Sequence, residues 1–424
     1  MTRTTQPERV RLLREILARE RITMMPCCYD GLTARLIERA GFEATFMSGF
    51  GVSAVHGFPD TQLLSFGEMV QAASYVCNAL NRIPCIGDGD TGYGNAINVK
   101  RTVKAYAQAG MAGIMIEDQV SPKRCGHTAG KAVVTRDEAY ARIRAAVDAR
   151  EEGGFDIVIL ARTDARHTHS PEEANARCRE FKRLGADLTF YEAPRDISEM
   201  RTYCSSVPGP KMANMVENGL TPILKPKVLQ EVGYKLVIYP LTLLSSSIKT
   251  METALTLLQS QGEESVDSVA IGDIAENEAA TASLRSLLTG FEHVKDVVGF
   301  TQYYQDENRH TILLTLWFLR YMEYRESLQL IRDKSCLSRT QGFVRTRKFK
   351  SLLRYDNTFK RITNWASLNS VLLSPIPEEV SGQESIDSAS ELRDTSMLRA
   401  SFVSYGSCDS HTQSTHSLSS SHTF

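Results

Sequence analysis

The sequence of 424 residues lacks the marks of several large protein classes. It has no run of about 18 apolar residues that could cross a membrane. Residues 1–7 contain no apolar segment of the kind that opens a secretory signal. Its 49 Lys and Arg residues nearly balance 50 Asp and Glu, which leaves a net charge of −1. So balanced a chain gives no reason to expect a nucleic-acid or membrane partner.

A cysteine pattern typical of disulfide scaffolds or zinc sites is also missing. The nine cysteines are odd in number, scattered, and never spaced as Cys-x-x-Cys. This distribution argues against a disulfide scaffold and a structural zinc site, and it favours a reducing compartment. We therefore expect a cytoplasmic globular protein. Hydrophobic residues make up 42% of the chain, enough to bury the core of one large domain with an appendage.

Eight short apolar runs occur before about residue 241, each followed by a stretch with helical periodicity. Turn and cap signals agree with them. Gly110 and Gly233 stand where a helix C-cap needs a left-handed residue, and Ser65 with Glu68 fits a capping box. Eight strand–helix units predict an α/β fold, a (β/α)8 barrel of the TIM type. The runs cover residues 22–25, 44–48, 83–90, 113–118, 157–163, 188–192, 211–215 and 236–241.

The C-terminal part of the chain has a different character. From about residue 242 the pattern is helical only, with candidate helices at 242–261 and 274–298. A barrel closed by its eighth strand needs one helix there, so the second is surplus and is interpreted as packing on another subunit. We expect a barrel domain at 1–305, a basic extension of unknown role at 306–373 and a disordered Ser- and Thr-rich tail at 374–424. For the basic stretch, a solvated amphipathic helix is a commoner explanation than a nucleic-acid or lipid surface.

Polar groups follow nearly every expected strand, at the barrel end where reactive groups gather. Asp88 and Asp90 lie two apart on one strand and so project to the same side, where paired oxygens suit Mg²⁺ or Mn²⁺. Turn or cap acids are the alternative, but Glu117 on the next strand completes an acidic pocket. Arg162 is expected to grip a substrate carboxylate, with a structural ion pair to Glu192 or Asp164 as the alternative.

The segment Ser121–His127 sets a thiol among cations and an imidazole, because Lys123 and Arg124 precede Cys125. Such an electropositive setting predicts that the thiol titrates near neutral pH. Cys125 can act as a nucleophile or as a general acid or base. Small residues after it predict a mobile loop that closes over substrate, which favours the acid/base role. His127 either binds substrate or orients the loop.

Taken together, these motifs resemble the isocitrate lyase/phosphoenolpyruvate mutase superfamily over about residues 8–300. The matching segments are 48–50, 87–94, 116–119, 123–127, 161–164 and 239–240. The resemblance implies a last helix exchanged between paired subunits, in a homotetramer built as a dimer of dimers. It implies Mg²⁺, with Mn²⁺ as an alternative, held near Asp88 and Asp90. The expected catalytic residues are Cys125, Glu117, Lys123, His127 and Tyr29. The expected substrate-binding residues are Ser48, Gly49, Phe50, Asp60, Gly126, Arg162, Glu192 and Asn214.

Superfamily members that cleave carbon–carbon bonds carry the loop cysteine, whereas the mutases have a different loop. Cys125 therefore predicts a magnesium-dependent lyase acting on a small 2-hydroxy or 2-oxo dicarboxylate, of the 2-methylisocitrate, 2,3-dimethylmalate or 2-alkylmalate kind. In the expected mechanism a base, from Glu117, Tyr29 or a metal-bound water, removes the hydroxyl proton, and Cys125 protonates the enolate held on the metal. An oxaloacetate hydrolase, a phosphonate-forming phosphomutase and a non-catalytic binding protein remain alternatives.

Overall fold

The computed structural model describes residues 3–128, 130–262 and 282–337. The chain divides after Arg320 into two units, and the barrel belongs to the first. The expected tail at 374–424 lies outside the described residues, as does most of the basic extension. The expected boundary after residue 305 falls inside a helix, α14 (Phe300–Leu337).

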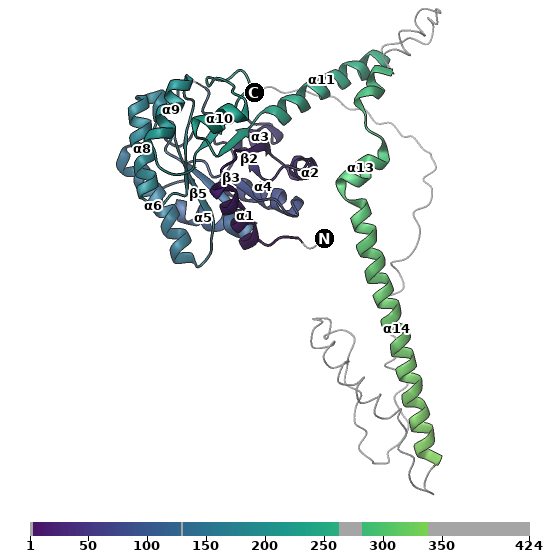
Figure 1. The fold of residues 1–424 in the computed structure, drawn as a ribbon. Helices are drawn as coiled ribbons and strands as arrows, with labels where there is room; N and C mark the ends of the chain where they lie inside the picture. Colours follow the sequence, from purple (N-terminus) through teal and green to yellow (C-terminus); the bar gives the residue numbers. More distant parts are fainter. Residues whose placement is uncertain (1–2, 129, 263–281, 338–424) are drawn as a thin grey trace, which may run out of the picture. The chain divides into compact units, whose positions relative to one another are not determined.

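Eight parallel strands form the centre of the first unit (Figure 1). They pair in the order β6-β5-β4-β3-β2-β1-β8-β7. An isolated parallel bridge between Thr189 and Lys211 joins the two ends of this sheet, so the barrel is nearly closed. The expected (β/α)8 architecture is confirmed. The strands are β1 (Thr23–Cys28), β2 (Thr45–Met47), β3 (Cys85–Asp88), β4 (Gly113–Glu117), β5 (Val158–Thr163), β6 (Leu188–Tyr191), β7 (Met212–Asn214) and β8 (Leu236–Tyr239).

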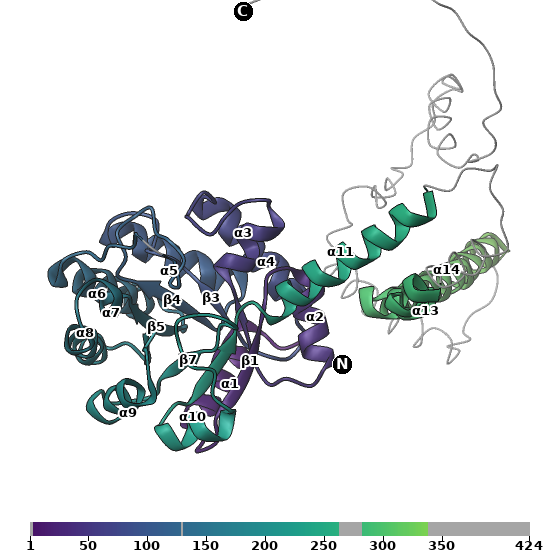
Figure 2. The same cartoon turned by 90° about the horizontal axis from the view of Figure 1, so that it is seen from above.

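Helices surround the strands, as the view in Figure 2 shows. Local signals set their ends: Ser65 and Glu68 form the expected capping box, and Gly110 and Gly233 end their helices with left-handed φ of 99° and 119°. The helices are α1 (Gln6–Ala18), α2 (Gly31–Arg39), α3 (Gly49–Val55), α4 (Phe66–Ala79), α5 (Ala96–Ala109), α6 (Arg136–Gly153), α7 (Ala165–Thr168), α8 (Pro171–Arg183), α9 (Ile197–Ser206) and α10 (Pro226–Val232).

One apolar cluster fills the inside of the barrel. Alternate residues of a strand face the same side, and the inward ones pack together here. Helix α1 adds Leu13 and Ile16 to the same cluster. The side chains on the opposite faces of the strands pack against the surrounding helices in two further clusters. The inward set is Met25, Cys27, Phe46, Ile86, Met115, Val158, Leu160, Leu188, Phe190, Met212, Leu236 and Ile238.

The same two-residue alternation places the site. At the C-terminal end of each strand, the residue two positions after the last inward apolar one again faces the barrel axis. At six strands this residue is polar, so six polar side chains converge above the apolar layer. They are Ser48, Asp88, Glu117, Arg162, Glu192 and Asn214.

Beyond the barrel, α11 (Thr242–Gly262) matches the helix expected at 242–261. Part of the helix expected at 274–298 lies outside the described residues, and the rest is not one continuous helix. A helical stretch at 282–287 is followed by a break, and α13 (Phe291–Val298) begins after Gly290. Among the described helices, none combines the length and hydropathy that a bilayer crossing requires.

Candidate active site

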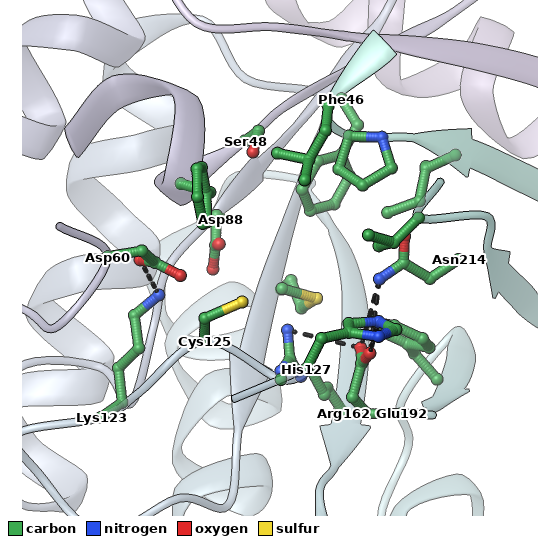
Figure 3. Close-up of a pocket in the computed structure, with 18 residues that line it drawn as sticks. Phe46, Ser48, Asp60, Asp88, Lys123, Cys125, His127, Arg162, Glu192 and Asn214 are labelled. Carbon is green, nitrogen blue, oxygen red and sulfur yellow. Dashed lines mark hydrogen bonds and ion pairs between the residues drawn. The ribbon is translucent and has the colours of Figure 1, made fainter. Parts of the chain in front are cut away.

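A cavity opens at the C-terminal ends of the strands, and Figure 3 shows the side chains that line it. Strand ends and the segments that directly follow them supply most of the lining, and the loop after β4 supplies Lys123, Cys125, Gly126 and His127. Of the residues expected from sequence, the cavity brings together Ser48, Phe50, Asp60, Asp88, Lys123, Cys125, Gly126, His127, Arg162, Glu192 and Asn214.

Four expected residues are not part of this lining. The hydroxyl of Tyr29 lies 3.2 Å from Oγ of Ser247 on α11. The N–H of Gly49 donates to Oδ2 of Asp88 at 3.2 Å, so that amide already has a partner. The other two, Asp90 and Glu117, are buried.

Asp88 and Asp90 form a buried acidic pair. The N–H of Asp90, whose φ of 47° is left-handed, donates to Oδ1 of Asp88 at 3.1 Å, and the Tyr93 hydroxyl donates to Oδ2 of Asp90 at 2.9 Å. Oδ1 of Asp90 accepts no well-formed hydrogen bond, although Nζ of Lys123 lies 3.0 Å away. Burial, together with the charge of Asp90, raises the pKa of Asp88 to about 6. A cation bound beside Asp88 and Asp90 would therefore stabilise their negative charges.

The described residues contain no group of three or more His, Cys, Asp or Glu side chains arranged to hold a metal ion. Magnesium does not need such a group, because it takes one or two protein carboxylates and completes its octahedron with water and substrate. The pair Asp88 and Asp90 therefore fits Mg²⁺ or Mn²⁺ better than it fits a metal that needs a full cage of protein ligands.

Lys123 joins the loop to two acidic groups. Its Nζ lies 2.5 Å from Oδ1 of Asp60 and 3.0 Å from Oδ1 of Asp90. Burial opposes the charged form, but Asp90, Asp60 and Asp88 outweigh it and raise the pKa of Lys123 well above its usual value. Lys123 is therefore a fixed positive charge rather than a proton acceptor, and Asp60 is its partner.

Arg162 holds three carboxylates at once. Its Nε lies 2.8 Å from Oδ2 of Asp164 and 3.1 Å from Oε2 of Glu117, and Nη1 lies 3.7 Å from Oε2 of Glu192. The ion pairs considered as an alternative for Arg162 are thus present, while the guanidinium still lines the cavity. Oε1 of Glu117 has no hydrogen-bond partner, and burial raises the pKa of Glu117 well above its usual value.

Cys125 points into the cavity, between Asp88 and His127 (Figure 3). The expectation that its thiol titrates near neutral pH is wrong. Burial raises the pKa of Cys125 from the ordinary 9.0, and the negative charges of Asp60 and Glu192 add to the effect. The backbone N–H of His127 and the charge of Arg162 lower the pKa, but they do not outweigh burial. At neutral pH the group is a thiol, which can donate a proton.

His127 connects the loop to two other parts of the site. Its Nδ1 accepts a hydrogen bond from the N–H of Leu220 at 3.0 Å, and its Nε2 lies 2.8 Å from Oε1 of Glu192. A Cβ on Gly219 would lie 2.7 Å from Nδ1, so the close approach of the ring requires glycine there. Of the two roles considered for His127, these contacts match the orientation of the loop.

The cavity has two chemically different sides. The part of the chain from β2 to just after β6 supplies the charged groups, whereas the segments after β7 and β8 supply Val216, Pro240 and Leu241. Sequence reasoning included residues 239–240 among the matching segments but missed Val216 and Leu241, although their position just past a strand end was a usable signal. It also missed Gln62, whose Oε1 accepts a hydrogen bond from the N–H of Lys123 at 3.1 Å. No local pattern marks that contact.

Comparison with known proteins agrees with this geometry. A family model described as phosphoenolpyruvate phosphomutase matches residues 13–258. The 2,3-dimethylmalate lyase of Eubacterium barkeri is 38% identical over 299 residues, which cover 70% of this chain and 96% of the relative.

Two solved structures share the fold. A crystal structure of 2,3-dimethylmalate lyase, described as a PEP mutase/isocitrate lyase superfamily member, has a TM-score of 0.64 and 34% identity over 72% of this chain and 96% of its own. Oxaloacetate acetylhydrolase in complex with the inhibitor 3,3-difluorooxalacetate has a TM-score of 0.64 and 30% identity over 72% and 98%. The expectation of an enzyme of the carbon–carbon lyase kind is confirmed. The chain belongs to the phosphoenolpyruvate mutase/isocitrate lyase superfamily.

Proposed function

We propose that the chain is a magnesium-dependent lyase that splits an alkyl-substituted 2-hydroxy dicarboxylate into a 2-oxo acid and a smaller carboxylate. The observation that carries the proposal is the thiol of Cys125. It is protonated at neutral pH, and it points into the cavity that Asp88 also lines. A proton donor beside a candidate metal site suits a reaction that ends with the protonation of a carbanion.

Asp88 and Asp90 would hold the metal ion, with Mg²⁺ favoured and Mn²⁺ as an alternative. When bound, the ion polarises the substrate oxygens and stabilises the negative charge that develops on them. Burial of both carboxylates supports this assignment, since a cation offsets the electrostatic cost of keeping two negative charges out of water.

The remaining charged groups orient the substrate. The guanidinium of Arg162 is suited to grip a carboxylate, and Ser48 and Asn214 add short polar side chains on neighbouring parts of the lining. Oδ1 of Asn214 is buried and has no hydrogen-bond partner, so it is available to accept the substrate hydroxyl. Glu192 is held between Arg162 and His127 and stabilises their positions.

The proton balance is simple. Glu117 would take the hydroxyl proton: it lies 3.1 Å from Nε of Arg162, which lines the cavity, and burial strengthens the hold of its carboxyl on a proton. The oxygen electron pair forms the new carbonyl while the bond to the neighbouring carbon breaks. The electron pair left on that carbon forms an enolate, which then takes the proton of the Cys125 thiol.

The apolar side of the cavity supports an alkyl-substituted substrate. Val216, Pro240 and Leu241 offer hydrophobic contact and no side-chain hydrogen-bond donor. Methyl or ethyl groups at the carbons next to the broken bond suit such a wall, whereas a hydrated 2-oxo group leaves its hydroxyls unpaired there. Oxaloacetate hydrolysis is the second candidate, favoured by the likeness to oxaloacetate acetylhydrolase.

A substrate panel tests the proposal. The protein is incubated with Mg²⁺ and, separately, 2,3-dimethylmalate, 2-methylisocitrate, 2-ethylmalate and oxaloacetate, and the 2-oxo acid or oxalate is quantified. We expect a 2-oxo acid from an alkyl-substituted substrate. Oxalate alone would establish the hydrolase instead. Phosphonate from phosphoenolpyruvate, detected by phosphorus NMR, would establish a mutase, and no turnover on any substrate would indicate a binding protein.

We also propose that the chain forms a homotetramer in which C-terminal helices pack on a partner subunit. The exposed side of α11 supports this, because it carries Ile248, Met251, Leu255 and Leu258, each at least 44% exposed. A stripe of this kind is typical of a subunit contact. Light scattering coupled to size-exclusion chromatography measures the assembly, and a monomeric mass at micromolar concentration would reject it.

A further inference from the structure

Lys131, at the end of the loop that carries Cys125, has no part in the roles described so far. Its side chain is fully buried, which is costly for an ammonium group unless hydrogen-bond acceptors surround it. Nζ donates to the backbone carbonyl of Gly126 and lies 3.0 Å from Oδ1 of Asp164, whose side chain is also fully buried. One acceptor belongs to the loop and the other to the barrel.

The barrel acceptor is itself rigidly held. Asp164 follows β5, and its N–H donates to Oδ1 of Asp118 at 2.9 Å. Its carboxylate accepts from Nε of Arg162 at 2.8 Å and from Nη2 at 3.2 Å. Arg162 and Lys131 both lower the pKa of Asp164 against the effect of burial, so the two cations share the charge balance of this aspartate. The contact that only Lys131 supplies is the one to the carbonyl of Gly126.

The loop lies tightly against the site at this point. A Cβ on Gly126 would approach Nη2 of Arg162 to 2.6 Å and Cδ of Glu192 to 2.7 Å. Gly126 directly follows Cys125, so its position sets where the thiol points. The opposite flank of the loop is fixed by Lys123 on Asp60, and the middle by His127. Lys131 holds the C-terminal flank of the loop through its contacts with Gly126 and Asp164.

We propose that Lys131 is a positioning residue for Cys125, which holds the Gly126–His127 peptide against the end of β5 and so keeps the neighbouring thiol over the cavity. This inference deepens the proposed function and rests on it, because the position of the thiol matters for a proton donor. The bond from a buried ammonium to a carbonyl is charge-assisted, which makes it strong enough to bias the loop towards its closed position.

Two variants and one matched control test the inference. Lys131→Met keeps the length of the side chain but removes the donor, and Lys131→Arg keeps a charged donor. Lys100→Met serves as the control because Lys100 on α5 pairs with the exposed Glu152 on α6, away from the loop. Iodoacetamide labelling, followed by mass spectrometry of peptides, gives the reaction rate of Cys125. Cys204 on α9 is an internal reference, since it is half-buried and its surroundings do not include the loop.

In Lys131→Met we expect the labelling rate of Cys125, relative to Cys204, to rise about tenfold or more as the loop opens. On the substrate that wild type turns over, we expect kcat to fall about 100-fold with a smaller change in KM, because the donor is misplaced while the binding groups stay. Lys131→Arg is expected to restore part of both. The control is expected to match wild type.

An unchanged Cys125-to-Cys204 ratio in Lys131→Met would overturn the inference. So would a parallel rise of both labelling rates together with a lowered melting temperature, which would indicate general destabilisation. If wild type turns over no substrate, the proposed function fails, but the labelling ratio still decides whether Lys131 holds the loop.

Discussion

The backbone N–H of Leu220 donates a hydrogen bond to Nδ1 of His127 at 3.0 Å, and this contact fixes the tautomer of the imidazole. Since Nδ1 accepts, the ring proton of the neutral form sits on Nε2, which lies 2.8 Å from Oε1 of Glu192. Nδ1 is therefore held by a hydrogen bond, and Nε2 by its closeness to a carboxylate. The imidazole connects the loop after β4 to the segment after β7, where it packs closely against Gly219 and Leu220.

A side chain at position 219 should displace the imidazole ring of His127. In Gly219→Ala the added Cβ would lie 2.7 Å from Nδ1 of His127, which is closer than real contacts allow. We expect turnover to fall about tenfold or more because the loop closes less completely. Gly67→Ala on α4 is the matched control, since the nearest atom to its new Cβ is 3.8 Å away. Steady-state kinetics on both variants checks this, and equal activities would contradict it.

Replacing the thiol tests the proton donor. In Cys125→Ser we expect turnover to fall by about 10²- to 10⁴-fold, because a hydroxyl is a much weaker acid in the same position. Substrate binding, measured by calorimetry in the presence of Mg²⁺, is expected to remain measurable. Cys204→Ser should keep wild-type turnover. Near-normal turnover of Cys125→Ser would remove the cysteine from the mechanism.

The raised pKa of Cys125 predicts how the labelling rate of this thiol changes with pH. The thiolate is the form that reacts with iodoacetamide, and a pKa above the ordinary 9.0 leaves little thiolate at neutral pH. We expect the labelling rate of Cys125 to keep rising from about pH 7 through about pH 9 without a plateau. Peptide mapping at each pH gives the rate. A plateau already reached below about pH 8 would show a pKa lowered rather than raised.

Metal removal tests the acidic pair. We expect a chelator to abolish turnover and Mg²⁺ to restore it. Asp88→Asn and Asp90→Asn should each weaken metal binding about tenfold or more, because each removes one of two carboxylate ligands. Mn²⁺ titration followed by electron paramagnetic resonance measures the affinity. Asp137→Asn, at an exposed position on α6, is the control. Full turnover in the presence of the chelator would reject metal dependence.

A buried ion pair below the site should matter for stability. Asp118 is buried and lies 3.0 Å from Nη1 of Arg177, which is also buried. Arg177→Met leaves this carboxylate without its counter-charge, and we expect a loss of about 3–5 kcal/mol in the free energy of unfolding. Arg183→Met removes an exposed pair on the same helix and should cost no more than about 0.5 kcal/mol. Urea denaturation compares the two, and equal losses would contradict the prediction.

Much of the site could be predicted from sequence because a strand has a period of two. Once a strand is located, its last inward apolar residue identifies the next inward position. That rule alone reaches Asp88 after Ile86, Arg162 after Leu160 and Glu192 after Phe190. It needs no knowledge of contacts between strands, which explains why the strand-borne residues were predictable.

Other features depend on contacts distant in the chain. The direction of the Cys125 pKa shift follows from burial and from the negative charges of Asp60 and Glu192, both distant from Cys125 in sequence. Tyr29 meets Ser247, 218 residues away, which takes its hydroxyl away from the cavity. A short stretch of sequence contains none of these distant groups. Sequence reasoning therefore identified Cys125 correctly as a lining residue but predicted the wrong direction for its pKa shift.

The division of the cavity between charged and apolar sides has a consequence for divergence among related enzymes. Val216, Pro240 and Leu241 shape the apolar side, yet none of them takes part in the ion pairs of Lys123 with Asp90 or of Arg162 with Glu117. Natural selection can therefore exchange these three side chains to admit a bulkier or more polar acid without rebuilding the groups that move the proton. The type of reaction can thus stay the same among related enzymes while the preferred substrate changes.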